Sequence, residues 1–202
     1  MSALSIPAFI LIVITAMVIL IFRDWRINAI ALAVQYLAAF LLITLSWPIG
    51  MAVVKLIVGW MATAAISITL LRQNPPEDSS ESVSSLFFRG LAGLLVILTI
   101  FILAPTLREN LFPNLETVIL QGGLMLIGMA LMQLGTNSDP LMTILSLLSL
   151  LSGFEIIHAG LETSTLLTGL LAIVNLGLAL VGVYFIIKTT EREGLTDQEE
   201  HP

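Results

Sequence analysis

Long apolar segments separated by short polar ones dominate the 202-residue chain. A helix that spans a lipid bilayer needs about 20 predominantly apolar residues. Segments of this kind occur at 4–22, 28–46, 48–71, 86–106, 115–134, 141–161 and 164–187. The pattern therefore predicts an all-α, polytopic membrane protein with seven transmembrane helices.

Local signals support several of these boundaries. Trp47-Pro48 separates the second and third segments, and proline favours the first turn of a new helix. The sequence Asn137-Ser138-Asp139-Pro140 is typical of a helix start, with a capping side chain followed by proline. Only residues 161–163 separate the last two segments, which are therefore predicted to form a tight antiparallel pair.

The basic residues indicate the orientation, because cytoplasmic loops of membrane proteins contain an excess of lysine and arginine. With the N-terminus outside, six of the eight basic residues lie in or beside cytoplasmic segments: Arg23, Arg26, Arg72, Arg89, Lys188 and Arg192. The outer loops contain Arg108, and Lys55 lies within a span. We therefore expect a protein of the cell (inner) membrane. Its N-terminus should lie outside and its C-terminus in the cytoplasm.

Two polar, acidic segments divide the chain. Residues 72–85, rich in proline and serine, predict a flexible cytoplasmic linker between a three-helix half (1–71) and a four-helix half (86–187). Residues 188–202 predict a disordered cytoplasmic tail. This tail either keeps the end of the chain solvated or binds a cytoplasmic partner.

The composition supports a membrane protein and excludes several kinds of chemistry. Hydrophobic residues form 57% of the chain and charged residues 11%, whereas soluble domains contain about 25% charged residues. The net charge of −6 argues against a nucleic-acid partner. With no cysteine and with His158 and His201 as the only histidines, thiolate metal sites and a bis-histidine haem are excluded. Since no catalytic motif is present either, we expect no metal, no cofactor and no catalytic residue.

Polar side chains within the spans are the candidates for function, because a charge at the bilayer centre costs about 3 kcal/mol or more. They are Gln35, Lys55, Gln121, Gln133, Glu155, His158 and Asn175, with Glu162 at the end of a span. At 1.5 Å per residue, Lys55 and Glu155 lie about 10 Å and about 9 Å from the outer surface. Two opposite charges on different helices are thus expected at similar depths.

Glu155, His158 and Glu162 are spaced i, i+3 and i+7, which places them on one face of a helix. They predict a polar stripe that begins at the outer surface and reaches inward to Glu155. Glu155 either takes part in proton or ion movement or forms a structural contact, such as a pair with Lys55. Lys55 could instead extend towards the nearby surface, and His158 is either a proton relay or an interfacial hydrogen-bonding residue.

Gln35 and Asn175 each lie eleven residues from the outer end of their span, near the bilayer midplane at about 16 Å. Amide side chains at such positions most often form hydrogen bonds between helices. They can also hydrogen-bond water, although they cannot titrate. A purely structural role therefore remains open for both residues.

Three stretches resemble one family of membrane subunits. The stretch FRDWRINAIALAVQYLAAFLL (22–42) resembles the second span of small proton-channel subunits. WPIGMAVVKLIVGWM (47–61) and LSLLSGFEIIHAGLETSTLLTGLLAIVNLGLALVGVYF (148–185) are similar to the corresponding helices of hydrogenase-4 component E. That component is related to the 4L-type (K) subunit of NADH:quinone oxidoreductase and to the C subunit of Mrp-type Na⁺/H⁺ antiporters.

The resemblance implies roles for particular residues. Glu155 matches the membrane glutamate of the penultimate helix in that family, and Lys55 matches the lysine of the third span. Gln35 stands where 4L-type subunits have a carboxylate, and Asn175 lies near their second one. The resemblance thus implies a proton path with fewer acidic groups than a 4L-type subunit has.

These observations lead to three functional hypotheses. The first is a cofactor-free integral membrane subunit of a complex I-like, hydrogenase-like or cation/proton antiporter complex. Its proton path would consist of Glu155, Lys55, His158, Gln35 and Asn175, and other membrane subunits would be its partners. The second is a stand-alone small membrane transporter, and the third is a scaffold or assembly subunit without a transport role.

Overall fold

The computed structural model describes residues 4–73, 83–137 and 139–200, and the regular structure within these residues is entirely α-helical. The helices are α1 (Ser5–Ile21), α2 (Trp25–Ile43), α3 (Ile49–Gln73), α4 (Val83–Leu111), α5 (Thr117–Thr136), α6 (Pro140–Leu161) and α7 (Thr165–Glu200). Six of them are long and apolar enough to cross a membrane, and α1, with 17 residues, is shorter. The all-α architecture of a multi-pass membrane protein is confirmed.

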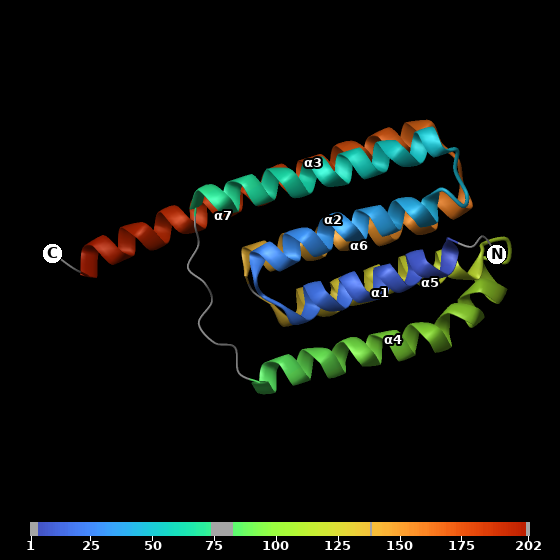
Figure 1. The fold of residues 1–202 in the computed structure, drawn as a ribbon, viewed down its shortest axis with the longest axis horizontal. Helices are drawn as coiled ribbons and strands as arrows, with labels where there is room; N and C mark the ends of the chain where they lie inside the picture. The colour runs from blue at the N-terminus through green and yellow to red at the C-terminus, as the bar shows by residue number, and fades with distance from the viewer. Residues whose placement is uncertain (1–3, 74–82, 138, 201–202) are drawn as a thin grey trace.

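The helices form two layers (Figure 1). The first layer contains α1, α2 and α3, and the second contains α5, α6 and α7. Each helix of the first layer packs on one of the second: α1 on α5, α2 on α6 and α3 on α7. The remaining helix, α4, packs beside α1 and α5. Consecutive helices run in opposite directions, so the two ends of the chain lie at opposite ends of the bundle.

The predicted start of α6 is confirmed. The Asp139 side chain accepts a hydrogen bond of 3.3 Å from the backbone N–H of Leu141, and Pro140 occupies the first turn. Proline is tolerated there because the first N–H groups of a helix have no partner within the helix. At the other end of α6, residues 162–164 connect it to α7, which is its antiparallel neighbour as predicted.

The backbones of α5 and α6 approach each other closely at two facing glycines. A Cβ atom built on Gly153 would lie 2.6 Å from the carbonyl oxygen of Gly123, and one built on Gly123 would lie 2.7 Å from the oxygen of Gly153. Any larger residue at either position would collide with the facing helix. Small residues at helix contacts are common in membranes, where close packing replaces the hydrophobic driving force.

The short helix α1 has its C-terminal end fixed by side chains of neighbouring helices. The last carbonyl groups of a helix have no partner within the helix. Gln133 of α5 donates to the carbonyl oxygen of Ile19 at 3.1 Å, and Asn28 of α2 donates to that of Phe22 at 2.9 Å. Both amides are buried, so these hydrogen bonds satisfy carbonyl groups that water would otherwise have to reach.

The C-terminal end of α7 differs from the prediction of a disordered tail. The span was predicted to end at residue 187, but the helix continues to Glu200. Extending an existing helix avoids the cost of nucleation, and the segment is rich in glutamate, glutamine, lysine and arginine, which are good helix formers. The linker predicted at 72–85 lies mostly in 74–82, outside the described residues.

Candidate functional site

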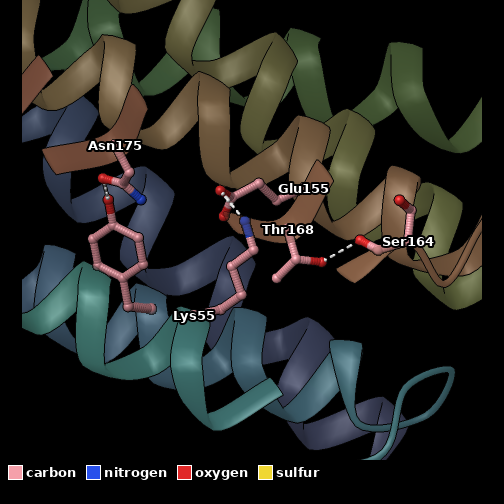
Figure 2. Close-up of polar contacts among 6 residues, drawn as sticks. Lys55, Glu155, Ser164, Thr168 and Asn175 are labelled. Carbon is pink, nitrogen blue, oxygen red and sulfur yellow. Dashed lines mark hydrogen bonds and ion pairs between the residues drawn. The ribbon is translucent and has the colours of Figure 1, made fainter. Parts of the chain in front are cut away.

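The centre of the candidate site is an ion pair between α3 and α6 (Figure 2). Lys55 Nζ lies 2.5 Å from Glu155 Oε1, and the two side chains are 4% and 3% exposed. Each residue is six positions from the end of its helix that faces the Trp47-Pro48 turn, which corresponds to a depth of about 9 Å. The structure therefore brings together the two opposite charges that the sequence placed at similar depth.

Burial makes the two charges depend on each other. Several kcal/mol are needed to remove each ion from water, and the attraction between them offsets this cost only while both are present and in contact. Lys55 does not extend towards the surface, because its ammonium group donates a hydrogen bond to the carboxylate. The pair thus ties a helix of the first layer to a helix of the second.

Two further polar contacts connect helices near the ion pair. The Tyr36 hydroxyl donates a hydrogen bond of 3.0 Å to Asn175 Oδ1, and Gln35 Nε2 donates one of 2.9 Å to Ser149 Oγ. All four side chains are buried. Gln35 and Asn175 therefore do form the interhelical hydrogen bonds expected of midplane amides.

The inward face of α7 and the residue before it carry a polar row, of which the sequence analysis identified Asn175 and missed Ser164 and Thr168. Ser164, Thr168 and Asn175 are spaced i, i+4 and i+11, which places them on one face of a helix. Figure 2 shows Thr168 between Ser164 and the Lys55–Glu155 pair, with Asn175 beyond the pair. The Thr168 hydroxyl donates to the carbonyl oxygen of Ser164 at 2.9 Å. The periodicity of these residues was the signal available in the sequence.

The predicted stripe on α6 is only partly buried. His158 is 8% exposed, and its ring lies against Trp47 and Phe154 at centroid distances of 6.1 and 6.2 Å. Neither imidazole nitrogen has a hydrogen-bond partner within the described part of the chain. Glu162 is exposed at the end of α6, where its backbone carbonyl accepts a hydrogen bond of 3.1 Å from the Trp47 indole. The buried part of the stripe thus consists of Glu155 and His158.

The remaining polar residues of the spans lie elsewhere. Gln133 is buried at the C-terminal end of α1, and Gln121 is half-buried on α5. Surface grooves of about 470 Å³ between α4 and α5 and about 240 Å³ between α6 and α7 are lined without charged side chains. Among the described residues, no cluster of three or more histidine, aspartate or glutamate side chains could hold a metal ion.

Comparison of the chain with models of protein families, with curated proteins and with solved structures gives no significant match. The resemblance to hydrogenase-4 component E therefore stays a prediction. The chemical features of the site are an acid and a base in direct contact, two interhelical amides and an imidazole one helical turn from the acid. Such an arrangement can accept and release protons, and it can also hold helices together.

Proposed function

We propose that this chain is a cofactor-free membrane subunit of a larger ion- or proton-translocating complex, of the kind to which hydrogenase-4 component E belongs. The observation that supports the proposal is the Lys55–Glu155 ion pair, buried about 9 Å from the end of a membrane-spanning bundle. Ionisable groups inside membrane bundles are expensive to bury and commonly mark ion and proton pathways. The partners would be other membrane subunits, which would provide the redox or antiport chemistry.

In this role, the contact between the two charges acts as a switch. A proton that binds to Glu155 neutralises the carboxylate and weakens its attraction for the Lys55 ammonium group. The ammonium group is then able to turn towards another acceptor, and release of the proton restores the pair. Gln35 and Asn175 orient water beside this pair without titrating, and His158 is the nearest titratable side chain towards the Trp47-Pro48 end.

The proposed orientation follows from the basic residues. Arg23, Arg26 and Lys188 belong to the end of the bundle opposite the Trp47-Pro48 turn, and the positive-inside rule makes that end cytoplasmic. Reporter fusions test this arrangement of seven spans. Alkaline phosphatase inserted at residues 112–116 should be active, and a fluorescent protein at the C-terminus should fluoresce. Activity of the phosphatase at the C-terminus instead would contradict it.

The subunit role is tested by purifying the tagged chain in a mild detergent. A subunit should co-elute with larger membrane proteins, which mass spectrometry would identify as antiporter-like, quinone-reductase-like or hydrogenase-like. A chain that elutes alone, at the size of a monomer or a homo-oligomer, would favour the stand-alone transporter.

The proton role is tested by the double substitution Lys55→Met with Glu155→Gln, which removes both charges and leaves none unpaired. In vesicles that contain the assembled complex, proton translocation should fall at least about 100-fold, the lower end of the range for loss of a positioned proton-transfer group. The matched control is Gln121→Leu, a half-buried polar residue of α5, a helix that carries neither charge of the pair. Unchanged proton translocation in a correctly assembled double variant would mean that the pair is only a structural contact. It would then favour the hypothesis that the chain is a scaffold.

A further inference from the structure

Two pairs of helices meet along one contact, which we call the seam. On one side are α2 and α6, and on the other are α3 and α7. The Lys55–Glu155 and Tyr36–Asn175 contacts both cross the seam, from α3 to α6 and from α2 to α7. The chemical character of the seam changes along the bundle axis.

Polar side chains occupy the half of the seam nearest the 162–164 turn (Figure 2). Thr168 lies three residues inside α7, at a depth of about 5 Å, and Asn175 lies at about 15 Å. The Lys55–Glu155 pair lies between them, at about 9 Å. Polar side chains therefore follow one another along the bundle axis from the bundle end to the midplane, one or two helical turns apart.

Several buried atoms in this half lack a protein partner. Gln35 Oε1, Asn175 Nδ2 and both ring nitrogens of His158 form no hydrogen bond with the described residues. An unsatisfied buried polar atom costs about 1–3 kcal/mol. Buried water commonly satisfies such atoms when several polar groups lie together. Water bound to the His158 nitrogens would lie between the ion pair and the bundle end, and water bound to Gln35 and Asn175 would lie on the deeper side of the pair.

The other half of the seam is apolar. Leu32, Ala62, Ile66, Leu148 and Ala179 are buried there within one hydrophobic cluster. They come from α2, α3, α6 and α7, so all four helices of the seam contribute to this apolar layer. On α3, Ile66 lies about 17 Å deeper than Lys55.

Two buried polar residues of this half, Thr63 and Ser146, form their hydrogen bonds within their own helices. The Thr63 hydroxyl donates to the carbonyl oxygen of Gly59 at 2.9 Å, and the Ser146 hydroxyl donates to that of Met142 at 2.6 Å. These side chains therefore offer no donor for a chain of water molecules. Water that passed through this half would have to separate packed leucine and isoleucine side chains.

We propose that the seam is a one-sided aqueous entry. Water and protons reach the Lys55–Glu155 pair from the 162–164 end, and the apolar layer closes the route from the opposite end. This inference deepens the proposed function, on which its relevance to proton movement rests. The access itself depends only on the bundle, so it can be tested without the partner subunits.

The absence of cysteine from the sequence allows the test to be made on the full chain in membranes. Three single variants are compared: Ser164→Cys at the entrance, Thr168→Cys inside the polar half and Ile66→Cys in the apolar layer. Silver ions, which are small and bind thiolates, are added to right-side-out or to inside-out vesicles. The protein is then denatured, and labelling with a maleimide reports the cysteines that silver has not blocked.

Silver added on the side of the 162–164 turn should abolish labelling of Ser164→Cys and Thr168→Cys, and labelling of Ile66→Cys should persist from both sides. The aqueous entry would be contradicted if silver blocked labelling of Ser164→Cys but not of Thr168→Cys. Loss of labelling of Ile66→Cys from the opposite side would overturn the closed end. The same labelling pattern in a chain that binds no partner and moves no proton would support the aqueous entry and contradict the proposed function.

Hydroxyl-radical labelling of the unmodified protein gives a second measurement that needs no variant to fold. His158 and Met142 are both buried, at 8% and 2% exposure. Methionine is intrinsically the more easily oxidised residue. Because hydroxyl radicals form from water, bound water beside His158 should nevertheless lead to modification of the histidine and not of Met142. Oxidation of Met142 without modification of His158 would overturn the proposal.

Discussion

Lys55 and Glu155 are 100 positions apart in the sequence, and their Nζ and Oε1 atoms lie 2.5 Å apart. Lys55 belongs to the first layer of helices and Glu155 to the second, so the pair joins the two layers across the seam. Neighbouring contacts across the seam, such as that of Tyr36 with Asn175, are hydrogen bonds between neutral groups. The pair is therefore expected to respond more strongly than its neighbours to loss of one partner.

Replacing one charge of this pair should destabilise the protein more than replacing both. Glu155→Leu leaves the Lys55 ammonium group buried without its partner, and we expect a loss of about 3–5 kcal/mol in the free energy of unfolding. Adding Lys55→Met removes the unpaired charge and should recover most of this loss. Unfolding temperatures in detergent, followed by size-exclusion chromatography with fluorescence detection, measure the difference. A double variant no more stable than Glu155→Leu would contradict this account.

The Tyr36–Asn175 hydrogen bond should contribute a smaller, measurable coupling. Tyr36→Phe removes the donor and leaves Asn175 Oδ1 buried without it, which should cost about 1 kcal/mol. A double-mutant cycle with Asn175→Leu isolates the coupling energy between the two side chains. Tyr184→Phe is the matched control, because Tyr184 is 58% exposed on α7. A coupling energy of zero would mean that the contact contributes nothing to stability.

The helices and the ion pair were largely predictable from the sequence. Apolar segments of membrane length have few alternatives to helix, because every backbone polar group must be satisfied within the bilayer. The similar depths of Lys55 and Glu155 followed from counting residues, although which helices are neighbours did not. Predicted boundaries lie within five residues of those in the structure, apart from the end of α7.

The neutral polar contacts were not predictable in the same way. Tyr36, Ser149 and Thr168 are ordinary residues of apolar helices, and their importance depends on the face that each helix turns towards its neighbours. That rotation is set by close contacts such as the one between Gly123 and Gly153. Single-sequence periodicity is weak in helices that are apolar on every side, because lipid and core select similar residues.

Gln133 should matter for stability although it lies far from the ion pair. Its side chain donates to the carbonyl oxygen of Ile19 at 3.1 Å, and Gln133→Leu leaves that carbonyl group without this partner. We expect a loss of about 1–2 kcal/mol in the free energy of unfolding. Gln121→Leu replaces a half-buried glutamine of the same helix and should change stability by less than about 0.5 kcal/mol. Equal losses in the two variants would show that the hydrogen bond to Ile19 is not the cause.

The contact between Gly123 and Gly153 sets how closely α5 and α6 approach, and a single methyl group should disturb it. In Gly153→Ala the new Cβ atom would lie 2.6 Å from the carbonyl oxygen of Gly123, so the helices must move apart. Overpacking of this kind typically costs about 1–3 kcal/mol. Gly177→Ala is the matched control, because a Cβ atom there meets nothing within 4 Å.

In the control, alanine should be neutral or stabilising by up to about 1 kcal/mol, since glycine is the poorer helix former. The two variants add the same methyl group to helices of one bundle, so their difference reports the α5–α6 contact alone. Unfolding temperatures in detergent should therefore fall for Gly153→Ala and stay constant or rise for Gly177→Ala. A Gly153→Ala variant as stable as the control would show that α5 and α6 can separate without cost, and the facing glycines would then not determine their spacing.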